Sequence, residues 1–410
     1  MAFFTTLRAW LQPQHKTNAG RTPRLQVDPW IIGLTLTLIS IGVVMVTSSS
    51  LPYAVDRTGN GFYYLFRHGF YLGIAALAAF FVLRQDTLQW QRIAMHLLVA
   101  VLVMLVLVLL LGREVNGAKR WLGFGSFTVQ VSELAKLFVI IYMADYLQRR
   151  NDVVRKDWEG FLRPLIIIGF TSMMLMLEPD YGATVVITVT CFVMMFLAGA
   201  RLWQFVALCV VAGLALAVVA LSAEYRLRRL QTFLDPWADP YGAGYQLTQS
   251  LIAFGRGDWI GQGLGNSLQK LAYLPEAHTD FIVAVIAEEF GIVGLLILLT
   301  VFAALCLRIL QIAKKALAQN MAFQAYGCIG IATWIALQVL INVGVASGAL
   351  PTKGLTLPFV SYGGNALIVT ITAIAFVLRV DYERRINSGA SLSADLHPRP
   401  APRFASEVSA

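Results

Sequence analysis

The stretch IAMHLLVAVLVMLVLVLLL (Ile93–Leu111) decides the fold class of this chain. It contains no charged side chain, and about 20 apolar residues are needed to cross a hydrocarbon core of roughly 30 Å. Lipid offers no hydrogen-bonding partner to a free backbone group, so a spanning segment must be a helix or part of a closed barrel. The run lacks the alternating pattern of barrel strands and therefore predicts a transmembrane helix.

Similar apolar runs recur along all 410 residues, of which 58% are hydrophobic and only 13% charged. A soluble domain carries about 25% charged residues, so a soluble multidomain enzyme is excluded. The runs lie at 30–48, 68–83, 93–111, 131–147, 164–178, 183–199, 202–221, 281–307, 321–346 and 365–380. We expect an all-α polytopic membrane protein with about ten transmembrane helices.

The cations predict the topology, because cytoplasmic segments near span ends accumulate Lys and Arg. Most of the 32 Lys and Arg residues fall in cytoplasmic segments if the N-terminus is inside, which places both termini in the cytoplasm. We predict an N-terminal tail at 1–29 and a membrane domain at 30–385. The Ser-, Ala- and Pro-rich tail at 386–410 is predicted to be disordered.

One outer, periplasmic loop, residues 222–279, is far longer than the usual connection of about 4–6 residues. Its stretches Tyr225–Leu234 and Tyr245–Phe254 mix apolar and polar residues at near-helical spacing, which predicts short amphipathic helices on the membrane surface. Another connection, Glu178–Gly182, is so short that it predicts a tight hairpin between two spans or a broken helix pair at membrane depth.

Several chemistries lack support in the sequence. The four cysteines lie in apolar runs without zinc or disulfide spacing, and neither HExxH nor GxSxG is present. The Gly-rich stretch Gly255–Gly265 lacks the Lys-Ser/Thr ending of a nucleotide-binding loop, and we interpret it as turns. The basic blocks lack the aromatic interleaving of a nucleic-acid surface, so we expect no nucleic-acid partner.

Ionisable residues in or beside spans are candidates for function. Glu133 and Lys136 are three residues apart, share a helical face and can neutralise each other, so a structural ion pair is at least as reasonable as a direct role. Glu288 and Glu289 point about 100° apart on a helix, so at least one needs a partner from another segment. We give structure more weight than chemistry for both.

Asp280 stands in LPEAHTDFI (Leu274–Ile282), where the long loop re-enters the membrane. On spacing alone, Thr279 or Asp280 is expected to cap the following helix. A carboxylate kept ionised at a helix end beside an outer cavity could also serve as a general base, with Glu276 and His278 on the same approach.

Outward-facing cations form a complementary set, which suits a lipid-linked phosphate or pyrophosphate. Its members are Lys119, Arg120, Arg226, Arg228, Arg229, Arg256 and Lys353.

The chain resembles the SEDS family of bacterial shape, elongation, division and sporulation proteins, because it contains four motifs that follow one another along the chain in the family's order. They are LPEAHTDFIVAVIAEEFG (Leu274–Gly291), RWL…SELAK (Arg120–Lys136), EPDYGA (Glu178–Ala183) and GLTLPFVSYGG (Gly354–Gly364). The stretches Asp235–Trp259 and Leu350–Pro358 resemble division members more than elongation members. Val131 and Asn365 depart from the family pattern, and neither change affects Asp280.

The resemblance implies a glycosyltransferase that polymerises lipid II into β-1,4 peptidoglycan strands at the outer face of the inner membrane, at the division septum. It implies Asp280 as the catalytic residue, and partnership with a class B penicillin-binding transpeptidase and other divisome membrane proteins. Apart from the resemblance, the chemistry leaves room for a divalent cation, Mg or Mn, at the pyrophosphate, and no cofactor is certain. The implied substrate-cavity residues are Lys119, Arg120, Glu133, Lys136, Glu276, His278, Lys353, Ser361 and Tyr362. Such a transfer needs one base and stabilisation of a departing pyrophosphate.

Two other functions remain open at this point. A flippase for the same lipid-linked precursor would also be a helical bundle with inward charges and a broken helix pair. A division scaffold would recruit partners without chemistry, and its cavity substitutions would leave growth and complex formation intact.

Overall fold

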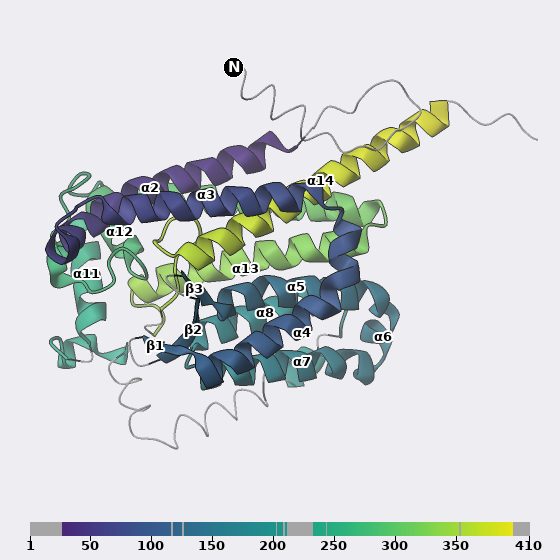
Figure 1. Cartoon of the computed structure of the whole chain (residues 1–410), viewed down its shortest axis with the longest axis horizontal. Helices are drawn as coiled ribbons and strands as arrows, with labels where there is room; N and C mark the ends of the chain where they lie inside the picture. The colour runs from purple at the N-terminus through teal and green to yellow at the C-terminus, as the bar shows by residue number, and fades with distance from the viewer. Residues whose placement is uncertain are drawn as a thin grey trace, which may run out of the picture.

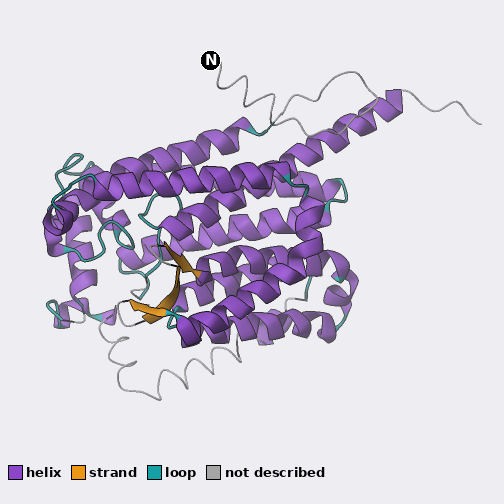
Figure 2. Cartoon of the chain, viewed as in Figure 1, coloured by secondary structure: helices purple, strands orange, loops and turns teal. Residues whose placement is uncertain are grey.

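Helices make up most of the computed structural model (Figures 1 and 2), which describes residues 27–396 except 116–117, 125–126, 202, 208–209, 211–232, 243 and 352–353. The main helices are α2 (Pro29–Thr58), α3 (Tyr63–Arg84), α4 (Thr87–Leu111), α5 (Val131–Arg149), α6 (Asn151–Lys156), α7 (Trp158–Leu177), α8 (Tyr181–Leu197), α11 (Tyr245–Gly257), α12 (Ile282–Ala318), α13 (Ala322–Ala346) and α14 (Gly364–Leu396). A 3-10 turn, η1 (Pro236–Ala238), and a π-helical turn, η2 (Gln269–Tyr273), lie in the long loop.

Nine of the ten predicted runs coincide with helices of the described chain. By length and hydropathy, seven of them can cross a membrane: α2, α3, α4, α7, α12, α13 and α14. Helix α8 is shorter, at 17 residues, and α5 carries the buried Glu133, Lys136 and Asp145. The predicted run 202–221 lies mostly outside the described residues, so the count of ten is not tested.

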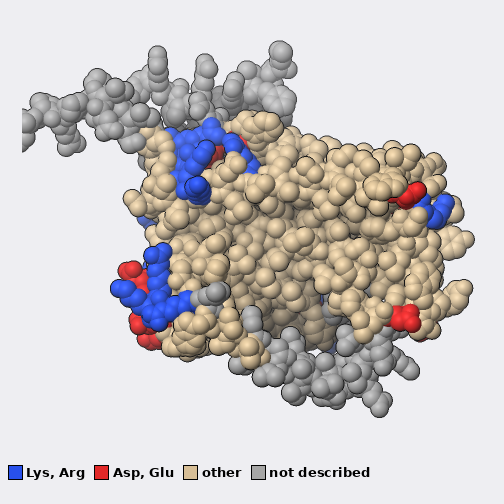
Figure 3. Space-filling view, turned by 180° about the vertical axis from the view of Figure 1, so that it is seen from behind, with Lys and Arg blue, Asp and Glu red and all other residues tan. Residues whose placement is uncertain are grey.

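Both ends of the membrane domain meet at one end of the bundle (Figure 1). Asp28 caps α2 by accepting hydrogen bonds from the backbone N–H groups of Trp30 and Ile31. Its carboxylate also pairs with Arg308 of α12 at 2.7 Å and Arg385 of α14 at 3.5 Å. Figure 3 shows Lys and Arg gathered mainly at this end, as expected for a cytoplasmic face.

A small antiparallel sheet departs from the predicted all-α fold. It has the order β1 (Arg113–Val115), β2 (Ala118–Phe124) and β3 (Phe127–Gln130), and pairs Trp121 with Gln130. The segment lies between the apolar runs that became α4 and α5. Its backbone groups satisfy one another across the ladder, since no helix continues there. The sheet lies at the end of the bundle opposite the termini (Figure 2).

Helix α12 is broken at Gly291, where φ is 68° and ψ is −168°. The loop after α11 pairs with the freed backbone: Gln262 N–H donates to the Glu288 carbonyl at 2.9 Å, and Ile292 N–H donates to the Asp258 carbonyl at 2.9 Å. A Cβ at Gly291 would lie 2.4 Å from the Trp259 carbonyl oxygen, so only glycine fits this close approach.

The predicted helices of the long loop and the predicted end of the last helix compare with the structure as follows. Helix α11 confirms the amphipathic helix predicted at Tyr245–Phe254, and it packs against α13 through a hydrogen bond from Ser250 to the Ala346 carbonyl. The other predicted loop helix lies almost entirely outside the described residues. Helix α14 continues to Leu396, past the predicted ordered limit at 385; its added residues include helix-favouring Ala and Leu, and the chain reaches Pro398 just beyond them.

Candidate active site at the outer end of the bundle

Two loops meet at the end of the bundle opposite the chain termini: the segment before α12, residues 274–281, and the segment before α14, residues 354–363. The backbone N–H of Tyr362 donates to the His278 carbonyl at 2.9 Å and joins them directly. Asn342 of α13 joins them a second time, because its amide nitrogen donates to the carbonyls of Asp280, at 3.0 Å, and Leu355, at 2.5 Å.

The carboxylate of Asp280 does not cap α12, contrary to the expectation from spacing. The capping position is Phe281, which has no side-chain capping bond, and Thr279 instead donates from its hydroxyl to the Glu276 carboxylate at 2.6 Å. Glu276 adopts φ of 56°, and its backbone carbonyl accepts a hydrogen bond from the N–H of Phe281. The hydrogen bonds of this turn are therefore made within residues 276–281. Among the described residues, the Asp280 carboxylate has no hydrogen-bond or ion-pair partner in the structure.

The Asp280 carboxylate lies against the backbone of Gly354. A Cβ built at Gly354 would lie 2.7 Å from Oδ2 of Asp280, closer than van der Waals contact allows. The glycine therefore lets the two loops approach with the carboxylate between them. This arrangement ties the GLTLPF motif to the HTD motif in space.

Burial raises the pKa of Asp280, which lies in the loop outside the membrane-spanning segments, to about 7. The negative charges of Glu276 and Asp180 raise it further, whereas the Arg120 guanidinium opposes them. An acid with a pKa near 7 changes protonation state close to physiological pH, which suits a general base.

His278 is buried within an aromatic cluster formed by Tyr53, Tyr64 and Tyr362. Its ring centroid lies 5.3 Å from that of Tyr53, 5.0 Å from that of Tyr64 and 5.7 Å from that of Tyr362. Burial lowers the pKa of His278, with the nearby Glu276 charge opposing this shift, so the neutral imidazole is favoured. The cluster joins α2, α3 and both loops.

Arg120 of β2 holds the turn between α7 and α8. Its guanidinium donates to the backbone carbonyls of Glu178, at 3.2 Å, and Pro179, at 2.6 Å. Asp180 caps α8 by accepting the N–H of Ala183, which confirms the predicted tight hairpin. The neighbouring Lys119 is exposed, since successive strand residues face opposite sides.

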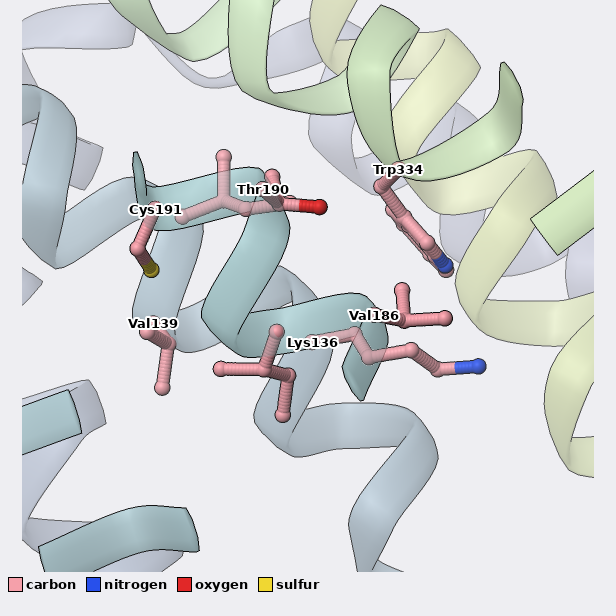
Figure 4. A pocket seen from close by; sticks show the side chains of 8 residues that line it. Lys136, Val139, Val186, Thr190, Cys191 and Trp334 are labelled. Carbon is pink, nitrogen blue, oxygen red and sulfur yellow. The ribbon is translucent and has the colours of Figure 1, made fainter. Parts of the chain in front are cut away.

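Glu133 and Lys136 form a buried ion pair of 2.7 Å within α5. The Lys136 ammonium also donates to Gln338 of α13 at 3.1 Å and lies 5.3 Å from the ring centroid of Trp334. Figure 4 shows Lys136 and Trp334 beside a narrow pocket with Thr190 and Cys191, and the two nitrogen atoms lie on the same side of it. The pair lies inside the bundle, and Lys136 has only 1% of its surface exposed.

Glu288 and Glu289 have partners from other segments, as expected for adjacent buried acids. Glu288 pairs with Arg256 at 2.5 Å and accepts hydrogen bonds from Ser267 and from two backbone N–H groups. Glu289 pairs with Lys270 at 2.8 Å and accepts a hydrogen bond from Ser48 of α2. These contacts hold the long outer loop against helix α12 beside its break.

The structure brings together Arg120, Glu276, His278, Asp280 and Tyr362. Ser361 is buried beside them and accepts the backbone N–H of Leu357 at 2.8 Å, whereas Lys353 lies outside the described residues. The sequence reasoning assigned no role to Gly354, although it lies in a recognised motif, and the residues Gln338 and Asn342 were missed. The available signal was polar amides four residues apart in an otherwise apolar span.

A resident divalent cation is not supported by the side chains at this site. Among the described residues, no three His, Cys, Asp or Glu side chains lie close enough together to hold a metal ion. We therefore assign no chemical step to a metal.

Comparisons with known proteins identify the family of the chain. A family model described as a cell cycle protein, covering FtsW, RodA and SpoVE, matches residues 29–386. The protein named "Probable peptidoglycan glycosyltransferase FtsW" of Alteromonas naphthalenivorans is 49% identical over 388 residues, covering 95% of this chain and 75% of that protein. The protein of the same name in Idiomarina loihiensis is 48% identical over 377 residues, covering 92% and 90% respectively.

Solved structures give the same result. One, described as showing structural coordination of polymerization and crosslinking by a peptidoglycan synthase complex, has a TM-score of 0.73 at 31% identity and covers 88% of this chain and 99% of that chain. The Thermus thermophilus rod shape determining protein RodA has a TM-score of 0.65 at 28% identity, with coverage of 88% and 98%. The chain therefore belongs to the cell cycle protein family of FtsW, RodA and SpoVE, the SEDS family that its motifs indicate.

Proposed function

We propose that this protein is a peptidoglycan glycosyltransferase that polymerises lipid II at the outer face of the bacterial inner membrane during septal wall synthesis. The observation that supports the chemistry best is the Asp280 carboxylate. It has no partner among the described residues, has a pKa raised to about 7, and lies between two loops at the end of the bundle opposite the termini. The names of the relatives support the reaction class.

In the proposed reaction, Asp280 accepts the proton of the acceptor sugar's 4-hydroxyl group. The hydroxyl oxygen of the acceptor forms a bond to the anomeric carbon of the donor as that proton leaves. The bond from that carbon to the donor's pyrophosphate oxygen breaks, and its electron pair leaves with the lipid pyrophosphate. An α-linked donor thus becomes a β-1,4 glycosidic bond in one inverting displacement. Pyrophosphate is already a good leaving group, so no general acid is required.

Arg120 is the described cation best placed to stabilise the departing pyrophosphate, because it acts electrostatically on Asp280. Two of its N–H groups are engaged with the Glu178 and Pro179 carbonyls, which orients the guanidinium. The remaining N–H groups have no acceptor among the described residues, and we propose that they bind phosphate oxygens. We propose Lys119 and Lys353 as further phosphate contacts. Glu276, His278, Ser361 and Tyr362 would shape the sugar-binding side of the site.

We assign Glu133 and Lys136 an indirect role, because their charges neutralise each other inside the bundle. We further propose that the protein works with a class B penicillin-binding transpeptidase and other divisome membrane proteins. Polymerised strands need crosslinking, and one structural relative comes from a complex that coordinates both steps.

The test uses purified protein reconstituted with its transpeptidase partner and lipid II. Wild type, Asp280→Ala and Asp280→Asn are compared for glycan strands at equal folded amounts. Polymer from the wild type alone, with partner binding retained in the variants, is the expected result. Equal polymer from all three would exclude Asp280 as the base. No polymer from any, in an assay validated with another polymerase, would favour a flippase or a scaffold.

A further inference from the structure

Three buried side chains of α13 form a stripe that runs from Lys136 inside the bundle to the two loops of the candidate active site. Trp334, Gln338 and Asn342 are spaced four residues apart and therefore share one helical face. Each has no more than 2% of its surface exposed. A buried polar stripe in an apolar helix costs free energy unless its groups are hydrogen-bonded, so the partners of the two amides are informative.

The amide of Gln338 has one orientation that satisfies all its neighbours. Its oxygen accepts from the Trp334 indole at 2.7 Å and from the Lys136 ammonium at 3.1 Å, and both of these groups only donate. Its nitrogen donates to the Thr356 carbonyl at 2.8 Å. The buried Lys136 is thereby connected to the loop before α14.

The amide of Asn342 lies one turn closer to Asp280 and binds the loops through its nitrogen alone, because its oxygen is buried without a hydrogen-bond partner in the described structure. Its nitrogen donates to the carbonyls of Asp280 and Leu355, which only accept, so both of its hydrogens are used. Leu355 follows Gly354, whose backbone lies against the Asp280 carboxylate. One side chain therefore holds the catalytic loop and the glycine loop at a fixed separation.

We propose that Asn342 is a positioning residue for glycosyl transfer, which sets the Asp280 carboxylate against the Gly354–Thr356 segment by binding the backbone of both loops. This inference rests on the proposed function, because it takes Asp280 as the base. Asn342 acts through the backbone of Asp280.

The pH dependence of the rate can separate positioning from a general structural role. The charged groups that act on Asp280 are Glu276 from its own loop, Arg120 from β2 and Asp180 from the start of α8. If loss of Asn342 lets the loops separate, water reaches the Asp280 carboxylate and its pKa falls towards the ordinary value. The pH at half-maximal rate should then fall below that of the wild type.

The experiment compares wild type, Asn342→Leu and the milder Asn342→Ser as purified, folded proteins polymerising lipid II from pH 5.5 to 8.5. Asn266→Leu is the matched control, since Asn266 is exposed in the long loop and also donates to a backbone carbonyl, that of Gln262. We expect kcat of Asn342→Leu to fall at least tenfold, KM for lipid II to stay within about twofold, and the half-maximal pH to shift downward. Asn266→Leu should match the wild type in all three.

Hydrogen exchange of the backbone amides gives a second readout that does not depend on activity. In Asn342→Leu and Asn342→Ser, residues 276–281 and 354–357 should exchange faster, whereas α4 should not change. Unchanged exchange in both loops, or a lower kcat with an unchanged half-maximal pH, would overturn the positioning role. A wild-type protein that makes no polymer would overturn the proposed function, and the exchange rates would still decide whether Asn342 holds the loops together.

Discussion

Asp280 and the pair Glu288 and Glu289 lie within ten residues of one another, yet their carboxylates have opposite surroundings. Glu288 and Glu289 are fully buried, and each has a cation and a hydroxyl group as partners. Asp280 is partly exposed and, among the described residues, its carboxylate has no such partner. Partnered carboxylates stabilise the break in α12 and anchor the long loop, whereas the unpartnered carboxylate is the one that we propose acts on substrate.

The largest predicted effect is on activity at Asp280. Asp280→Asn should lower the polymerisation rate by about 10²–10⁴-fold, because the amide cannot accept the hydroxyl proton. Its thermal unfolding in detergent should match the wild type, since no cap or ion pair is lost. An equally large loss of rate in Glu289→Gln, at equal folded amounts, would remove the distinction between the two kinds of carboxylate.

The reverse pattern is expected at Glu288. Glu288→Ala leaves Arg256, Ser267 and two backbone N–H groups without their acceptor. The free energy of unfolding should therefore fall by about 2–3 kcal/mol. This loss is smaller than the roughly 3–5 kcal/mol typical of breaking a fully buried ion pair, because the Arg256 side chain is 35% exposed and regains water. Denaturant midpoints measure this. A variant as stable as the wild type would show that the carboxylate does not hold the loop.

A smaller effect on activity is expected at Gly354. Gly354→Ala places a methyl group 2.7 Å from Asp280 Oδ2, so the carboxylate must move and the rate should fall about tenfold. Gly255→Ala in α11 is the matched control, because its added methyl group meets open space. Equal rates for the two variants would mean that the position of the Asp280 carboxylate is not critical.

The smallest effect is expected at Glu178, a third situation. Its carboxylate is fully buried, and neither oxygen has a hydrogen-bond partner in the described structure. Burial raises the pKa of Glu178 to about 8, so its carboxyl is only partly ionised at pH 8. Glu178→Gln removes this partial buried charge without breaking an ion pair, so thermal stability should stay the same or rise slightly at pH 8. A large destabilisation, measured by thermal unfolding, would show that the carboxylate itself is needed for folding.

The sequence predicts the helical bundle well because each span must be apolar over a length that the bilayer sets. It does not predict where helices extend beyond the lipid. Helix α2 continues through polar residues to Thr58, and this extension contains Tyr53, whose ring contacts that of His278. The small sheet at 113–130 was also missed, because short polar strands between two spans have no strong apolar pattern.

The candidate site divides in the same way. Asp280 was identified from its motif, but its predicted capping role was wrong, because Glu276 rather than the helix determines the geometry of that turn. Asn342 was missed because its partners are backbone carbonyls of distant segments, which no local spacing shows. Gly354 was part of a recognised motif, yet its close approach to Asp280 depends on tertiary packing.

The most direct test of the account is the pH dependence of the wild-type polymerisation rate at lipid II concentrations well below KM, where the rate reports kcat/KM and therefore the pKa values of the free protein. A base acts in its deprotonated form, so the rate should rise with pH, reach half its maximum near the pKa of about 7, and fall about tenfold for each pH unit well below it. A rate that is constant between pH 5.5 and 8.5, or that falls as the pH rises through 7, would contradict the assignment of Asp280 as the general base.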